Sequence, residues 1–128
     1  MNIPGDLKYT RDDEWIRVTG GEGEIGITDY AQDHLSDIVY VELPEVGKVV
    51  NSHDSIGTIE SVKAAADIYS PVSGTIMAVN ESLPDSPELV NQDPYGRAWM
   101  VRIELSNPSE LDALMDAAAY QKYCEERG

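Results

Sequence analysis

The order of apolar and polar positions predicts a chain built mainly of short strands. Residues 15–18, 24–27 and 38–43 are rich in β-branched and aromatic side chains, and the pair Gly20-Gly21 separates the first two. Such runs around a glycine pair predict a hairpin followed by a further strand. Within residues 99–105 the odd positions carry Trp, Val, Ile and Leu, the period-two pattern of a half-buried strand.

Helices are expected between and after these strands. Thr28 can cap a brief helix over residues 29–35, because its hydroxyl can accept a backbone N–H left unpaired at the helix start. Residues 85–88, Asp-Ser-Pro-Glu, predict another helix start with proline in the first turn.

The C-terminal segment, about residues 107–126, is also expected to be helical. Asn107 is a candidate N-cap, Pro108 suits the first helical position, and Glu110 could reach back to the cap in a capping box. The expected apolar stripe, which the last three residues extend or restart, is Leu111, Leu114, Met115, Ala118, Tyr120, Tyr123 and Cys124.

Residues 56–72 predict two strands that meet at a turn near Lys63. Apolar residues precede and follow this position, while residues 64–66 are alanines that leave the lysine amine sterically open. The nearest acids, Glu60 and Asp67, flank the turn. A lysine amine presented in this way can be acylated by a ligase.

A short repeat surrounds this lysine. Residues 44–49 and 71–76 share the pattern P-x-x-G-x-[VI]. Proline fixes φ and glycine permits positive φ, so each copy predicts a turn that leads into a strand. Two such units related by a pseudo-twofold axis would form a flattened barrel, with the lysine hairpin at one end.

The segment Glu60-Ser61-Val62-Lys63-Ala64, followed by Pro71-Val72-Ser73-Gly74, resembles the attachment segment of lipoyl carrier domains. In those domains the lysine forms an amide with lipoic acid. Biotin carriers normally place this lysine between two methionines, whereas here its neighbours are Val62 and Ala64. The resemblance therefore implies lipoate on Lys63 rather than biotin. The alternative from residue type alone is an ordinary solvated turn lysine.

Composition restricts the partners. The chain has 128 residues, which suits one domain, and its formal net charge of −15 argues against nucleic acid or an anionic membrane, both of which need a basic face. The acidity either keeps the protein soluble or steers it toward positively charged partner surfaces. With no Phe, the core must use Val, Ile, Leu, two Trp and several of the seven Tyr.

Other chemistry finds little support. The single cysteine, Cys124, excludes an intramolecular disulfide, and His34 and His53 lack metal-ligand spacing, so no metal site is expected. The first residues show no signal or transit peptide, which predicts a cytoplasmic protein, or a mitochondrial matrix one if a presequence was removed. No phosphate loop or nucleophile–base pair is evident, so we expect no catalytic residues and a non-enzymatic role.

Further motifs extend the resemblance over nearly the whole chain, to the H-protein family of the glycine cleavage system. They are Leu7-Lys8-Tyr9, Asp13-Glu14-Trp15, Ile25-Gly26-Ile27-Thr28, Ala31-Gln32, Val41-Glu42-Leu43-Pro44, Val79-Asn80-Glu81, Pro87-Glu88-Leu89-Val90-Asn91, Pro94-Tyr95-Gly96 and Trp99. One departure is Asp13, where family members commonly have histidine before Glu-Trp. This substitution makes that edge more acidic.

The resemblance implies a mainly β fold: a flattened antiparallel barrel or sandwich of the lipoyl/biotinyl carrier type, with an N-terminal β extension, a short helix and a C-terminal helix. Residues 1–128 would form one carrier domain, with a core at about 38–105. The function implied is that of a monomeric carrier. It would take the aminomethyl group of glycine from the P-protein (glycine decarboxylase) to the T-protein (aminomethyltransferase). It would also pass reducing equivalents to the L-protein (dihydrolipoamide dehydrogenase), after a lipoate ligase or lipoyltransferase has modified Lys63.

In this family the lipoyl-lysine arm that carries the aminomethyl group can fold back into a surface cleft. The resemblance implies that Glu14, His34 and Asp67 match positions near this cleft. The alternative is that these three residues are ordinary solvated surface groups. Two other functions stay open at this point: a biotin carrier of a carboxylase, and an unmodified module whose partners contact only its acidic surface.

Overall fold

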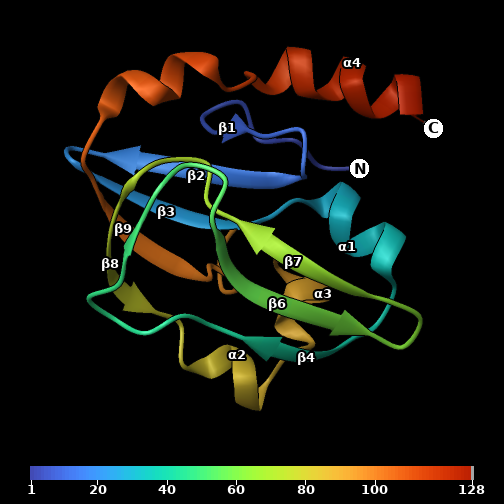
Figure 1. Cartoon of the computed structure of the whole chain (residues 1–128). Helices are drawn as coiled ribbons and strands as arrows, with labels where there is room; N and C mark the ends of the chain where they lie inside the picture. Colours follow the sequence, from blue (N-terminus) through green and yellow to red (C-terminus); the bar gives the residue numbers. More distant parts are fainter. Residues whose placement is uncertain (128) are drawn as a thin grey trace.

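Two antiparallel sheets face each other across the main core (Figure 1). The structure is a computed structural model and describes residues 1–127. The larger sheet has the order β1 (Lys8–Tyr9), β2 (Glu14–Thr19), β3 (Glu22–Ile27), β9 (Val101–Leu105), β8 (Gly74–Val79) and β5 (Val49–Val50). The smaller one has the order β4 (Ile38–Glu42), β6 (Ser55–Ser61) and β7 (Ala65–Tyr69).

The predicted fold class is confirmed. Neither sheet closes on itself, so the molecule is a sandwich of two open sheets and not a closed barrel. Isoleucine and valine side chains from both sheets fill the space between them, as expected for a chain without phenylalanine. Because side chains alternate along each strand, these inward residues leave the polar positions outside.

The two copies of the sequence repeat pair with each other. Val49 lies opposite Thr75 and Val50 opposite Gly74 in the β5–β8 ladder. Gly47 has a φ of +94°, so the predicted need for positive φ is confirmed there. The same prediction is wrong for Gly74, whose φ is not positive. At Gly74 a Cβ would collide with the carbonyl oxygen of Glu104 on β9, so close backbone approach requires the glycine.

The short helices agree with the sequence in part. Helix α1 (Asp29–Leu35) begins after Thr28, whose Oγ1 accepts the Ala31 N–H at 3.1 Å, as predicted. The helix start predicted at residues 85–88 is displaced. Asp85 ends α2 (Ser82–Asp85), and Pro87 precedes Glu88, the residue before α3 (Leu89–Gln92).

The C-terminal segment is not one helix. A 3₁₀ helix, η1 (Pro108–Ala113), is followed by a bridge between Met115 and Tyr9, and α4 (Ala117–Arg127) then begins. The capping box is absent because the Glu110 carboxylate accepts hydrogen bonds from the Ser73 N–H and hydroxyl instead, at 2.8 and 2.9 Å. Of the two alternatives for the end of the chain, a helix that restarts near Tyr120 is therefore confirmed.

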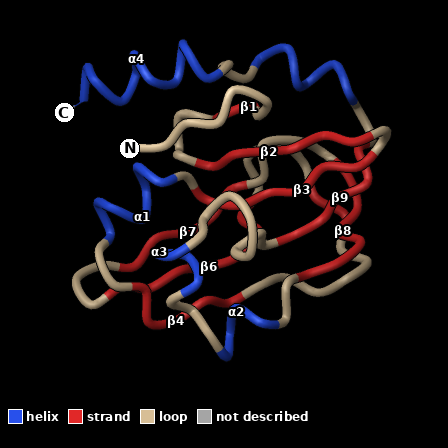
Figure 2. The backbone as a smooth tube through the Cα atoms, turned by 180° about the vertical axis from the view of Figure 1, so that it is seen from behind, coloured by secondary structure: helices blue, strands red, loops and turns tan. Residues whose placement is uncertain are grey.

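Helix α4 runs along β1 (Figure 2) and packs on a second, aromatic core. The Tyr9 and Tyr120 rings stack at 4.6 Å, and the Trp15 side chain is fully buried beside them. The buried members of this cluster are Leu7, Tyr9, Trp15, Tyr30, Tyr95, Tyr120 and Cys124. The N-terminal strands and the C-terminal helix are thus joined by side chains that only the tertiary fold brings together.

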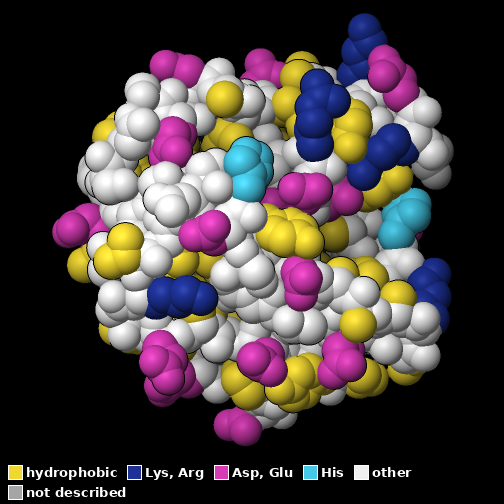
Figure 3. Space-filling view, viewed as in Figure 1, with side chains coloured by type: hydrophobic (Ala, Val, Ile, Leu, Met, Phe, Trp, Pro, Cys, Tyr) yellow, Lys and Arg dark blue, Asp and Glu magenta, His cyan; other side chains and the backbone are white. Residues whose placement is uncertain are grey.

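Acidic side chains are spread over the face shown in Figure 3, with hydrophobic groups and a few basic side chains between them. Among residues 1–127, no helix is long and apolar enough to span a bilayer.

Candidate functional site

Hydrogen bonds fix the backbone of the turn between β6 and β7. The Ser61 N–H donates to the Ala64 carbonyl at 2.7 Å, and Ser61 Oγ accepts the N–H groups of Lys63 and Ala64 at 3.2 and 3.1 Å. Outside the hairpin, the Val62 N–H donates to the Asp37 carbonyl at 3.0 Å. Lys63 therefore lies at the tip of an ordered turn, as predicted from the sequence.

The Lys63 side chain itself is free. It is exposed, and within residues 1–127 its amine takes part in no ion pair or hydrogen bond. The neighbouring Val62 is 67% exposed, so the tip presents an apolar group beside the amine. This combination of a fixed backbone and an accessible amine suits covalent modification by another protein.

The three residues proposed near a cleft do line one cavity of about 200 Å³. It lies where α1 and β7 meet the turn before β2, so Glu14, His34 and Asp67 come from three elements. Asp12 and Asp13 add further acids to its wall. The apolar lining is Ile27, Ala31, Leu35, Ile59, Ala66 and Ile68.

Glu14 is a buried carboxylate and not a solvated one, since only 2% of the residue is exposed. The Thr10 hydroxyl donates to Glu14 Oε1 at 2.6 Å, and the Tyr69 N–H donates to Oε2 at 3.3 Å. Burial raises the pKa of Glu14 to about 7, although both hydrogen bonds act in the opposite direction. No lysine or arginine pairs with this carboxylate in the described part of the chain.

His34 and Asp67 are both exposed at the same cavity. The imidazole of His34 stacks on the Tyr30 ring at 4.0 Å, and its Nδ1 lies 2.9 Å from the Tyr30 carbonyl oxygen. A carbonyl can only accept, so Nδ1 carries the proton in this contact. Asp67 Oδ1 accepts a long hydrogen bond of 3.4 Å from the Thr58 hydroxyl.

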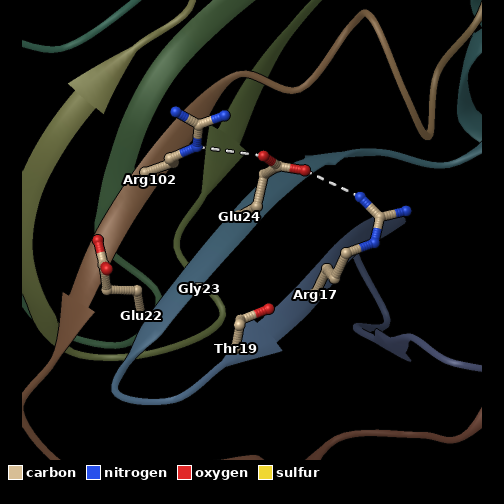
Figure 4. Close-up of a pocket in the computed structure, with 6 residues that line it drawn as sticks. All are labelled: Arg17, Thr19, Glu22, Gly23, Glu24 and Arg102. Carbon is tan, nitrogen blue, oxygen red and sulfur yellow. Dashed lines mark hydrogen bonds and ion pairs between the residues drawn. The ribbon is translucent and has the colours of Figure 1, made fainter.

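A second depression lies on the larger sheet, away from the lysine hairpin (Figure 4). There Glu24 accepts hydrogen bonds from Arg17 at 2.8 Å and from Arg102 at 3.2 Å. The two guanidinium groups also lie over the Trp15 and Trp99 rings. Both arginines are thus engaged with Glu24 in partly exposed ion pairs, which contribute little to stability.

The comparisons with known proteins agree on one family. A family model described as Glycine cleavage H-protein matches residues 7–127. The chain belongs to the glycine cleavage H-protein family. A Glycine cleavage system H protein of Symbiobacterium thermophilum is 54% identical over 125 residues, covering 98% of each chain.

Other members of the family show similar coverage. A Glycine cleavage system H protein of Carboxydothermus hydrogenoformans is 55% identical over 126 residues, which is 98% of this chain and 97% of its own. The Glycine cleavage system H protein 2, mitochondrial, of Arabidopsis thaliana is 53% identical over 94% of this chain and 78% of its own. The crystal structure of an H protein from Mycobacterium marinum superposes with a TM-score of 0.86 and 37% identity, covering 98% of this chain and 99% of its own.

Several residues that shape the site of this H-protein family member escaped sequence analysis. Ser61 could have been found, because serine before a tight turn commonly bonds to the backbone two residues on. Thr10 could not, since its bond to Glu14 spans a turn whose shape was unknown. Arg127 could not either, since its contact with Asp13 spans 114 residues.

Proposed function

We propose that this chain is the lipoyl-bearing carrier protein of a glycine cleavage system, acting as one domain with lipoate attached to Lys63. The observation that carries the proposal is the free Lys63 amine on an ordered hairpin tip in a member of this family. Bound lipoate supplies a dithiolane whose disulfide can accept electrons together with the aminomethyl group of glycine. The protein supplies position, shelter and charge.

The length of β7 fits such an arm. Asp67 lies four residues after Lys63, which is roughly 13 Å along an extended strand. The side chain of lysine joined to lipoate has about eleven bonds before the dithiolane ring, or roughly 14 Å at the rise of an extended chain. An arm that lies along β7 can thus reach the cavity with Asp67 and Glu14.

The cavity fits a cationic cargo. Transfer of a charge to a buried site is costly unless the charge is paired, and Glu14 has hydrogen bonds but no cationic partner in the described residues. The amine of an aminomethyl group is protonated near neutral pH, so Glu14 can offer it a charge-assisted hydrogen bond. Lipoate without cargo has no such amine, so the cleft would select the loaded arm.

In this proposal the P-protein, the T-protein and the L-protein each meet the arm, and a lipoate ligase or lipoyltransferase installs it. The acidic surface would steer the carrier toward basic entrances on these partners. We place the carrier in the compartment that holds these enzymes, which is the cytoplasm in a bacterial cell.

The test is the intact mass of the protein expressed with and without lipoate, followed by peptide mapping. We expect the mass of one lipoyl group, located on Lys63 and lost in Lys63→Arg, which keeps the charge but removes the acylatable amine. Modification of Lys8, Lys48 or Lys122 would contradict the proposal. The mass of biotin would favour the carboxylase carrier, and an unmodified chain would favour the acidic interaction module.

A further inference from the structure

The last turn of α4 reaches the acidic turn at the cleft wall. Arg127 Nη2 donates to Asp13 Oδ1 at 2.6 Å, and Nη1 donates to Oδ2 at 3.2 Å. The guanidinium carbon also lies 4.0 Å from the centre of the Tyr123 ring and 4.3 Å from that of Tyr30. A bidentate pair between two aromatic rings fixes both position and orientation.

Asp13 in turn forms hydrogen bonds with Thr28 and Tyr120. Its φ is +68°, a positive value that an aspartate tolerates better than most residues. The Asp13 carbonyl accepts the Thr28 N–H at 2.9 Å, next to the start of α1, and the Tyr120 hydroxyl donates to Asp13 Oδ1 at 2.8 Å. The residue that follows is Glu14, the buried acid of the cleft.

Figures 1 and 2 both show α1 near the C-terminal end of α4 on one side and near β7 on the other. Asp13, which Arg127 contacts, lines the cleft at this place. The side chains of Arg127 and Asp13 are only 28% and 18% exposed. The negative charge of Asp13 thus has its own cation, Arg127.

We propose that Arg127 is a positioning residue of the arm-sheltering cleft: it holds the turn from Thr10 to Glu14 through Asp13 and neutralises Asp13, so that Glu14 is the acid available to the cargo amine. This inference rests on the proposed function. A free Asp13 carboxylate at the cleft wall would compete for the same ammonium group. Asp13 already contributes to the raised pKa of Glu14, and without Arg127 its like charge would favour the neutral acid further.

The charged and titratable groups that face Glu14 come from three places. Asp12 and Asp13 lie on its own turn, His34 lies on α1, and Asp67 lies on β7. Arg11 also lies on this turn, with its guanidinium over the Tyr123 ring, and Arg127 is the cation that pairs with Asp13 in the described structure. Loss of the Arg127 charge therefore leaves an unbalanced carboxylate beside Glu14.

The first measurement uses the protein without lipoate. Carbon-detected NMR titration of the Glu14 carboxyl in Arg127→Gln should show a midpoint higher by roughly half a unit to one unit. Arg127→Lys keeps the cation and should titrate like the wild type. The control Arg102→Gln removes an arginine that also contacts a carboxylate and an aromatic ring, but outside the lining of the cleft, and should leave Glu14 unchanged. An unshifted midpoint in Arg127→Gln overturns the proposal.

The second measurement is loss of the one-carbon unit from the lipoylated, loaded carrier without T-protein. Arg127→Gln should lose it roughly threefold to fivefold faster, and Arg127→Lys should lie between Arg127→Gln and the wild type, because lysine cannot reproduce the two-bond contact. If Arg127→Gln unfolds α4, seen as faster exchange of the Tyr120 amide, a wild-type rate in Arg127→Lys overturns the proposal.

Glu14→Gln separates this inference from the proposed function. If Glu14→Gln and Arg127→Gln both release cargo at the wild-type rate, the cleft does not shelter the arm, and both the shelter and the role of Arg127 toward it are wrong. If Glu14→Gln speeds release and Arg127→Gln does not, the shelter stands and the inference about Arg127 fails.

Discussion

Replacing Glu14 by Gln should flatten the pH dependence of stability between pH 5 and pH 8. Burial raises the pKa of Glu14 to about 7, above the ordinary value of 4.5. The folded state therefore binds a proton more tightly than the unfolded state does. The stabilisation from this proton is complete below the unfolded pKa and is lost as the pH rises through the folded one. Glutamine resembles the protonated acid at every pH.

The size of the effect follows from the two pKa values. Integrating the proton-binding difference between pH 5 and pH 8 gives a loss of ~2.5 kcal/mol for the wild type that Glu14→Gln should not show. If the folded pKa were one unit lower, the loss would fall to ~1.2 kcal/mol. Both values exceed the usual uncertainty of a mutant comparison, so the measurement can separate them.

The assay is urea unfolding of the protein without lipoate, since urea adds no salt that would screen the charges. The matched control is Glu45→Gln, which removes one negative charge from an exposed loop position. The control should keep the wild-type slope with pH, while Glu14→Gln should not. Parallel curves for the wild type and Glu14→Gln would show that Glu14 is ionised as an ordinary surface acid.

Three further predictions test the fold and the surface. Because the arm is attached outside both cores, lipoylation should change the thermal midpoint little, and a stabilisation of several degrees would show that the arm packs against the fold. The apparent Michaelis constant for the carrier in the P-protein reaction should rise with ionic strength, as −15 formal charges imply, and an insensitive constant would refute steering. Gly74→Ala should lower the free energy of unfolding in urea by roughly 1–3 kcal/mol, because the added Cβ would collide with the Glu104 carbonyl. The control Gly5→Ala has open space around it and should keep the wild-type stability. Equal stability of the two variants would contradict the collision.

Local patterns in the sequence predicted the parts of the fold that depend on neighbouring residues. The hairpin around Lys63 and the Thr28 cap rest on contacts within a few positions, so residue order contains the information needed. The strand predicted within residues 99–105 is observed over Val101–Leu105, because Met100 just before it is buried and breaks the alternation. The Met100 N–H donates to the Ile25 carbonyl, a bond that a periodicity cannot show.

Predictions failed where a distant partner competed for the same group. Glu110 fits a capping box, yet Ser73 takes both of its carboxylate oxygens. Glu14 could be matched to the cleft, but the hydrogen bond that it accepts from the Tyr69 N–H spans 55 residues. Asp13 added acidity to an edge in the sequence, and the structure pairs it with Arg127 at the far end of the chain. Pairings of this range have no local signal.

The buried acid links stability to cargo selection. The raised pKa of Glu14 means that its ionised form is disfavoured by ~3 kcal/mol relative to an ordinary acid, and a docking ammonium group offsets this cost. Below the folded pKa, docking must release the proton of Glu14, so the affinity for the loaded arm should rise by up to about tenfold per pH unit as the pH approaches about 7. Above it, the carboxylate is already ionised and the affinity levels off. An arm without an amine gains nothing at any pH. The stability that the empty carrier loses near neutral pH and its preference for the loaded arm thus have the same cause, a carboxylate buried without a cation.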